Sequence, residues 1–240
     1  MNRTKKIILA ILVIVVIALV AMIAGVFYIK DTNPGLTEGN KNILVCAIDE
    51  GEDRPGMGAC DMAFIVNLDN GTIKNYIPVY PGGMTHPNAS EPAEAQEQGA
   101  GPALLLHDAF WDDDNQKDMK FAKEIVENQT NISIDAVVAI NVKGIDAILH
   151  AAGPLEINGT NTSASSIDII REEYSTENIS RGDAVMDIVH AVIKASKDPV
   201  KKTAMLNAAL NQYSQGNIIM DQQRAFVGLL ASLELDSFLG

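Results

Sequence analysis

The hydrophobic residues of this chain begin as one long block and then break into short runs. Residues 7–29 contain no charge, Asn, Gln or Pro, and a polar stretch rich in Gly and Asn follows at 31–41. Two apolar runs, at 42–49 and 62–69, have the length and composition of buried strands, and a third strand is predicted at 73–80. The short Asn-Gly-Thr turn between the last two predicts a hairpin.

Helical spacing of the apolar residues takes over from residue 91. Two more apolar runs, at 134–141 and 217–220, are typical of strands. Helices are predicted at 118–128 and 142–153, after Ser180, from Asp198 to Gly216 and after Asp221. Strands therefore alternate with helices behind an early hairpin, which predicts an α/β fold in which helices sandwich a mixed β-sheet.

The block at 7–29 is long enough to cross a membrane. Its 23 residues, at about 1.5 Å of rise each, give a helix longer than the bilayer's apolar core of about 30 Å. A cleavable signal peptide is the alternative, but its apolar core spans only about 7–15 residues and ends in a small-x-small cleavage site. Phe27, Tyr28 and Lys30 close the block without such a site, which favours an uncleaved transmembrane helix.

The charges beside this block give its orientation. Arg3, Lys5 and Lys6 precede it, whereas Lys30 and Asp31 nearly cancel after it. The positive-inside rule then places the N-terminus in the cytoplasm of a single-pass protein of the cell membrane. The expected regions are a cytoplasmic N-terminus and anchor at 1–30, a juxtamembrane linker at 31–41 and one extracellular domain at 42–240.

The external part is strongly acidic. Four of the 18 Lys and Arg residues lie in the first 30 positions, which leaves 14 against 31 Asp and Glu, a balance of −17. Such a surface repels phosphate backbones, so nucleic acid is excluded as a partner. The external arginines are Arg54, Arg171, Arg181 and Arg224.

N-glycosylation triplets, Asn-X-Ser/Thr, are frequent in the external part. Their excess indicates a surface glycoprotein from a host with the machinery to use them, as archaea and eukaryotes have. The alternative is that Asn, Ser and Thr gather in turns for structural reasons. The triplets begin at Asn70, Asn88, Asn128, Asn131, Asn158, Asn161 and Asn178.

The chain has two cysteines, Cys46 in a predicted strand and Cys60 at the start of the next. In an oxidising compartment they permit one disulfide, provided that the two strands are neighbours in the right register. The alternative is that both are small buried apolar residues.

The candidate chemistry lies in residues 49–61, between the first two strands. Asp49 and Asp61 come at or near strand ends, where open α/β sheets collect ligands. Two carboxylates there can hold a divalent cation such as Mg²⁺, which suits a pyrophosphate-linked substrate. The alternative is a solvated acidic turn whose glycines serve the backbone geometry.

A second acidic run, at 112–114, follows the single tryptophan, Trp111. We interpret the run as the N-cap and first turn of the helix at 118–128, where the helix dipole favours carboxylates. Trp111 is interpreted as a packing anchor, with stacking on a sugar as the alternative.

Several segments resemble the family known as domain of unknown function 4012. NILVCAIDEGEDRPGMGACDMAFIVNLDNGTI, at 42–73, has a strand, an acidic residue, Arg-Pro, Gly-x-Gly and a second strand, as the opening of that family does. HDAFWDDD, at 107–114, and IDAVVAINVKGIDAILHAAGPLEING, at 134–159, resemble its later block. The resemblance covers roughly residues 42–235.

That family is similar to the LytR–CpsA–Psr group, whose members have one membrane helix and an external α/β domain. LytR–CpsA–Psr enzymes transfer polyprenyl-pyrophosphate-linked glycopolymers to the cell wall, with Mg²⁺ held by aspartates and an arginine cluster on the pyrophosphate. Asp61 matches the aspartate of their Arg-x-Asp motif, so the resemblance makes it the first candidate for catalysis and for the metal. Asp49 and Arg54 are the other catalytic candidates, and Arg54 is a partial substitute for the arginine cluster.

The chain departs from the LytR–CpsA–Psr motifs at the arginines. Ala59 stands where the Arg-x-Asp motif has its arginine, and the Pro-Arg-Asp motif falls on Pro78, Val79 and Tyr80. Two functions are therefore expected, and whether the protein is an enzyme stays open. The first is a role in cell-envelope assembly that binds or transfers lipid-linked glycopolymer. The second is a non-catalytic envelope protein that binds a glycan or a protein partner.

Overall fold

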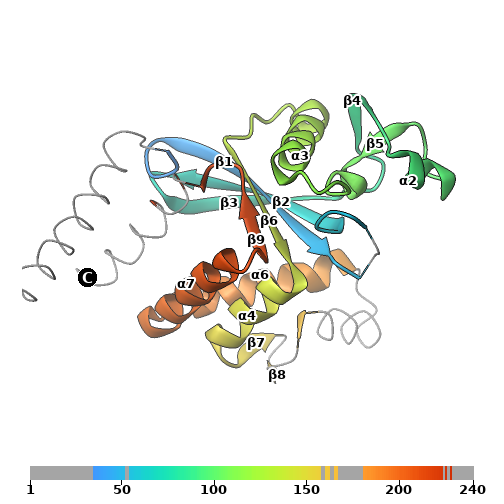
Figure 1. Ribbon diagram of the computed structural model, residues 1–240. Helices are drawn as coiled ribbons and strands as arrows, with labels where there is room; N and C mark the ends of the chain where they lie inside the picture. The colour runs from blue at the N-terminus through green and yellow to red at the C-terminus, as the bar shows by residue number, and fades with distance from the viewer. Residues whose placement is uncertain are drawn as a thin grey trace, which may run out of the picture.

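The structure, a computed structural model, describes residues 35–51, 54–157, 160–162, 165–166 and 181–223, together with 225 and 228 (Figure 1). Its strands are β1 (Asn40–Asp49), β2 (Ala59–Asp69), β3 (Thr72–Val79), β4 (Thr85–Ser90), β5 (Ala103–Leu105), β6 (Ala136–Asn141), β7 (Leu155–Ile157), β8 (Thr160–Thr162) and β9 (Ile218–Met220). Its helices are α2 (Ala93–Glu97), the 3₁₀ turn η1 (Leu106–Asp108), α3 (Asn115–Thr130), α4 (Val142–Ala152), α6 (Arg181–Ala195) and α7 (Pro199–Ser214).

Five strands form the central sheet, in the order β3-β2-β1-β6-β9. β1 and β6 are parallel, and the other neighbouring strands are antiparallel. Two small sheets, β4-β5 and β7-β8, accompany it. The sheet is therefore mixed, as predicted.

Helices cover both faces of this sheet, which confirms the predicted sandwich. α3 and the small β4-β5 sheet lie on one side, and α4, α6 and α7 lie on the other (Figure 1). The larger hydrophobic core lies under α3 and includes Leu44, Ile65, Phe110 and Ile125. A second core surrounds Leu149 and joins α4 to α6 and α7.

α3 is three residues longer at its start and two residues longer at its end than the helix predicted at 118–128. The carboxylate of Asp114 accepts the N–H of Lys117 at 3.2 Å and caps the first turn. The helix ends at Asn131, whose left-handed backbone (φ 56°) is one that asparagine adopts readily. The acidic run at 112–114 therefore serves the start of a helix.

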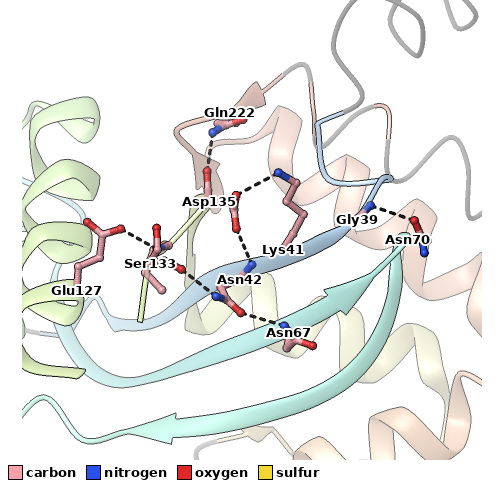
Figure 2. A network of polar contacts seen from close by, with 10 residues as sticks. Gly39, Lys41, Asn42, Asn67, Asn70, Glu127, Ser133, Asp135 and Gln222 are labelled. Atoms are coloured by element: carbon pink, nitrogen blue, oxygen red, sulfur yellow. Dashed lines mark hydrogen bonds and ion pairs between the residues drawn. The ribbon is translucent and has the colours of Figure 1, made fainter. Parts of the chain in front are cut away.

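Polar side chains form a hydrogen-bonded network at the edge of the sheet where β1 begins (Figure 2). Asp135 accepts the backbone N–H of Asn42 at 2.9 Å and the ammonium group of Lys41 at 3.2 Å. Asn42 donates to the carbonyl of Ser133 and accepts a hydrogen bond from Asn67 of β2. We call these five residues the linker-end network, because β1 begins here directly after the predicted linker.

The segment between the predicted strand at 73–80 and the helical region from residue 91 contains a strand that was not predicted. β4 lies within residues 81–92, where Thr85 pairs with Leu105 and Ser90 with Ala103. Its sequence, Thr-His-Pro-Asn-Ala-Ser, lacks apolar alternation because β4 pairs with β5 alone and is mostly exposed.

Some predicted elements fall outside the described residues. The transmembrane helix at 7–29 is one of them, and so is most of the helix expected after Asp221. No helix in the part of the chain that the structure describes is long and apolar enough to cross a membrane.

Candidate functional site

Four strand ends meet at the edge of the sheet opposite the linker-end network. β1 ends there at Asp49 and the parallel strand β6 at Asn141, while antiparallel β2 begins there at Ala59 and β3 ends at Val79. Ligands of open α/β sheets bind beyond the carboxyl ends of the parallel strands. We call this edge the site edge.

Asp61 lies at a bulge in β2. Ala47 pairs with Met62 and Ile48 with Cys60, so Asp61 is the extra residue between two pairs. A bulge breaks the alternation of a strand and redirects a side chain. The side chain of Asp61 is accordingly 55% exposed, directly beside the buried Cys60. The bulge therefore exposes Asp61, the first candidate from the sequence, to solvent at the site edge.

Two of the segments that carry the family resemblance, 42–73 and 107–114, pack directly against one another. The N–H of Gly56 donates to the carbonyl of Trp111 at 2.8 Å. A Cβ at Gly56 would lie 2.1 Å from the carbonyl oxygen of Asp112, so a side chain cannot fit. Gly58 has a φ of +132°, and its Cβ would lie 2.2 Å from the carbonyl oxygen of Asp49. Because they lack a side chain, these two glycines allow one backbone segment to pack directly against another. We call the contact between the two resemblance segments the joint.

Arg54 lies in the centre of this joint. Its guanidinium forms an ion pair with Asp108 at 2.7 Å, lies 4.9 Å from the ring centre of Trp111 and donates to the carbonyl of His107 at 3.1 Å. The planar guanidinium suits such stacking and pairing. The side chain of Arg54 is only 3% exposed. Protein groups therefore enclose the arginine that was a candidate for pyrophosphate, and the buried Trp111 is a packing anchor.

His107 connects the buried ion pair to the exposed Asp61. Its Nδ1 lies 3.0 Å from the carboxylate of Asp108, and its Nε2 lies 3.6 Å from that of Asp61. The hydrogen bond with Asp108, followed by the Asp61 carboxylate, raises the pKa of His107 to about 10. The ring is therefore a cation at neutral pH, between one buried and one exposed carboxylate.

Glu91 adds a second buried carboxyl group beside the ion pair. It accepts the N–H of Leu105 at 2.6 Å. Burial raises the pKa of Glu91 to about 7, and the charge of Asp108 adds to the effect. Burial opposes the ionisation of Asp108 too, but His107 and Arg54 outweigh it and lower the pKa of Asp108. We call Arg54, Glu91, Asp61, His107 and Asp108 the charged cluster.

Sequence reasoning did not assign His107 or Glu91 to a site. His107 is next to Asp108 in the sequence, but its other partner, Asp61, lies on a different strand. The spacing of residues along the sequence cannot reveal such a contact, because folding brings the two segments together. The one available signal is that His107 opens the second block of the family resemblance.

The magnesium site that the resemblance implies at Asp61 stays a prediction. The carboxylate of Asp49 accepts the N–H of Gly51 at 2.7 Å, and Asp61 faces the cationic His107. Among the residues with a described position, no three His, Cys, Asp or Glu side chains are grouped so that they could hold a metal ion. Mg²⁺ keeps several water ligands and is held by one or two carboxylates together with substrate phosphates, so the exposed Asp61 stays a candidate ligand.

Cys46 and Cys60 are free, completely buried thiols on the neighbouring strands β1 and β2. They are not directly opposite, because Cys46 pairs with Ala63 and Cys60 with Ile48. A hydrogen bond with Cys46, together with burial, raises the pKa of Cys60 well above its usual range. They therefore pack as small core residues in this structure, and a disulfide between them stays a prediction.

The predicted glycosylation sites are on the surface wherever their side chains are described. These exposed sites are Asn70, Asn88, Asn128 and Asn131. The side chains of Asn158, Asn161 and Asn178 lie outside the described residues. Glycosylation itself stays a prediction.

Comparison with known proteins gives a family match over more than half of the chain. The family described as protein of unknown function (DUF4012) matches residues 38–174. No curated protein matches the chain.

The fold is similar to that of several solved bacterial structures. Protein gbs0355 from Streptococcus agalactiae has a TM-score of 0.53 and 15% identity, over 86% of this chain and 76% of that one. TagV from B. subtilis has a TM-score of 0.52 and 15% identity, over 82% and 80%. TagT from B. subtilis has a TM-score of 0.50 and 14% identity, over 84% and 76%, and it has also been solved bound to LI-WTA. TagV and TagT are LytR–CpsA–Psr proteins, so the relation inferred from the sequence is confirmed at the level of the fold.

Proposed function

We propose that this chain, which belongs to the DUF4012 family of proteins of unknown function, is a membrane-anchored domain that binds glycopolymer in the cell envelope and does not transfer it. Residues 7–29 anchor the protein, and the linker at 31–41 carries the domain outside the cell.

The fold supports a role in the envelope. The LytR–CpsA–Psr resemblance implies work on glycopolymers, and the structure shares its architecture with TagV and TagT. Function is carried by sites and not by folds, so the choice between binding and transfer depends on the residues at the site edge.

The burial of Arg54 is the single observation that carries binding over transfer. A pyrophosphate-transferring site of this group uses arginines, whose guanidinium forks bind two phosphate oxygens at once. Here the guanidinium of Arg54 forms an ion pair with Asp108 and stacks on the ring of Trp111. Ala59 and Val79 stand where the transferases have arginines. No group that could hold a metal ion is found among the described residues, and Arg54 is enclosed, so neither supports the stabilisation of a leaving pyrophosphate.

The test compares binding with transfer in the full chain in detergent micelles. The probe is a polyprenyl-pyrophosphate-linked oligosaccharide with a fluorescent label on the sugar, offered with cell-wall fragments and with either Mg²⁺ or a chelator. We expect saturable binding of the probe in both conditions, without release of the polyprenyl group. Release that depends on Mg²⁺ would establish transfer, and the absence of any binding would rule out the proposed function.

A further inference from the structure

A group of lysines gathers where α6 ends and α7 begins. Residues 194–202 contain a single acidic residue, Asp198, and we call this stretch the lysine corner. It is basic, although the external part of the chain has an overall balance of −17. Its lysines are Lys194, Lys197, Lys201 and Lys202.

Most of these lysines have no acidic partner. Lys194 forms an exposed ion pair with Glu156 at 2.7 Å. In the part of the chain that the structure describes, no carboxylate forms an ion pair with Lys197, Lys201 or Lys202. Lys197 is exposed, and the other two are half-exposed. Three ammonium groups are therefore available to an anionic partner.

The first turn of α7 gives two of these lysines no structural reason to be there. The N-terminal end of a helix dipole is positive, so it favours carboxylates and disfavours cations. Asp198 is the N-cap, and its carboxylate accepts the N–H of Val200 at 2.8 Å. Lys201 and Lys202 follow it, and the first turn holds no acidic residue. Residues that break a local rule without a compensating contact are expected at functional sites.

An exposed apolar residue lies among the lysines. Val200 is 78% exposed, more than any other large apolar residue that the structure describes. Pro199 beside it is exposed as well. Cations around an exposed apolar side chain suit the surface of a lipid bilayer, where phosphate groups lie next to the boundary of the acyl chains. A soluble anionic partner would use the lysines but would leave Val200 in water.

The lysine corner lies at the end of the molecule where β1 begins. α7 is 16 residues long, about 24 Å, and just after it the carbonyl of Asn217 accepts the N–H of Asn141 at the site edge. At the other end of α7, the ammonium group of Lys201 lies 3.9 Å from where a Cβ of Gly153 would be, and Gly153 ends α4. α4 begins at the site edge, so both helices extend away from that edge. In Figure 1 the orange start of α7 and the blue start of β1 both lie on the left.

The proposed anchoring brings this end of the molecule close to the membrane. The ten residues 30–39 separate the predicted transmembrane helix from β1, and even fully extended they span at most about 36 Å. The site edge lies farther away by the length of β1, about 33 Å at 3.3 Å per residue. The lysine corner is therefore within reach of the lipid headgroups, whereas the site edge is directed away from them.

We propose that the lysine corner docks on the anionic headgroups of the membrane that holds the anchor. Lys197, Lys201 and Lys202 pair with lipid phosphate groups, and Val200 contacts the apolar boundary beneath them. This contact keeps the linker end on the membrane and directs the site edge outwards, to where a glycopolymer extends. The inference rests on the anchoring in the proposed function and adds an interaction surface to it.

The test measures energy transfer from a dye on the domain to acceptor dyes on lipid headgroups. The full chain is placed in nanodiscs of phosphatidylcholine, either alone or mixed with the anionic lipid phosphatidylglycerol. The donor dye is attached to Asn207→Cys, an exposed position of α7, and it labels that position alone because both native cysteines are buried. We expect more transfer with phosphatidylglycerol, and a return to the lower value in high salt, which screens the lysines. A donor on Gly82→Cys, beyond the end of β3 at the site edge, should show less transfer in both lipids.

A triple variant removes the charge of the lysine corner. Lys197→Gln, Lys201→Gln and Lys202→Gln together should abolish the increase with phosphatidylglycerol. Each lysine near an anionic surface favours contact roughly fivefold, so the ratio of docked to undocked domain should fall about 100-fold. The matched control removes the same charge from the other face of the sheet and should keep the increase. It combines Lys117→Gln, Lys120→Gln and Lys123→Gln of α3.

The outcomes separate this inference from the proposed function. Equal transfer in the two lipid mixtures, an unchanged increase in the lysine-corner variant, or the same loss in both triple variants would overturn the docking. If the chain still enters the nanodiscs in these cases, the proposed anchoring stands and only the docking fails. A chain that does not enter the nanodiscs would contradict the anchoring and the docking together.

Discussion

The two edges of the central sheet carry polar networks of different kinds. In the linker-end network, backbone groups are the main partners, as in the bonds from Asn42 to Asp135 and to the carbonyl of Ser133 (Figure 2). In the charged cluster, charged side chains bond to one another. The first arrangement fixes where strands begin, whereas the second holds charges in place and leaves two of them at the surface.

The exposure of the ion pairs shows what this difference means for stability. The side chains of Lys41 and Asp135 are 30% and 34% exposed, whereas those of Arg54 and Asp108 are 3% and 8% exposed. An ion pair in contact with water contributes little, because water compensates for a lost partner. Removing one partner of a buried pair leaves a charge that nothing compensates. The same type of contact should therefore respond very differently at the two edges.

Arg54→Ala tests the buried pair and has the largest expected effect. It leaves Asp108 ionised and enclosed, and it removes the stacking partner of Trp111, so we expect a loss of about 3–5 kcal/mol in the free energy of unfolding. Urea denaturation followed by circular dichroism measures it. The control is Lys74→Ala, which breaks an exposed pair with Asp69 and should change stability by less than about 1 kcal/mol. Equal losses in both variants would contradict a buried pair that holds the joint together.

Gly56→Ala tests the joint between the two family segments. The new Cβ would lie 2.1 Å from one backbone oxygen and 2.5 Å from another, and neither can move without displacing the loop after Phe110. We expect a loss of about 3 kcal/mol in the same denaturation experiment. Gly82→Ala is the matched control, since nothing lies within 4 Å of its Cβ, and its effect should stay within about 1 kcal/mol. A tolerated Gly56→Ala would show that the two segments do not need this close approach.

The strands of the central sheet were predicted from the sequence, whereas β4 was not. β1 and β2 were predictable because apolar residues fill the buried positions of each strand, and β3, which is mostly exposed, was predictable because a short Asn-Gly-Thr turn joins it to β2. β4 was not, because a short exposed strand carries no such signal. The sequence of a strand therefore predicts that strand where its side chains pack in a core.

The candidate site was predictable only in part. Asp61 could be found because it adjoins a strand end, but the bulge that exposes it arises from pairing with β1. Arg54 is attractive in the sequence as a surface cation, and the fold buries it on Trp111. The roles of His107 and Glu91 depend on contacts between distant segments, which no spacing along the chain encodes.

Glu91→Gln tests whether the site edge contains a buried acid that titrates. The pKa of Glu91 rises from an ordinary 4.5 to about 7 in the folded chain. Its contribution to stability is therefore fully present below pH 4.5 and is lost as the pH rises to about 7. The glutamine cannot titrate, so the difference in unfolding free energy between parent and variant should shift by on the order of 2 kcal/mol across that range. Glu94→Gln, on the exposed face of α2, is the matched control for the change of residue type. Parallel profiles for the parent and Glu91→Gln would show that the carboxyl group of Glu91 does not cause the pH dependence of stability.

Lys41→Ala tests the linker end and has the smallest expected effect. It removes the 3.2 Å ion pair with Asp135 but leaves the hydrogen bond from the Asn42 backbone to the same carboxylate. Water reaches both groups, so we expect a loss of only about 0.2–1 kcal/mol by urea denaturation, and less in high salt. A loss close to that of Arg54→Ala would mean that the charge of Lys41 is as important as the buried pair. In that case the ion pairs at the two edges would contribute alike to stability, although one is buried and the other is in contact with water.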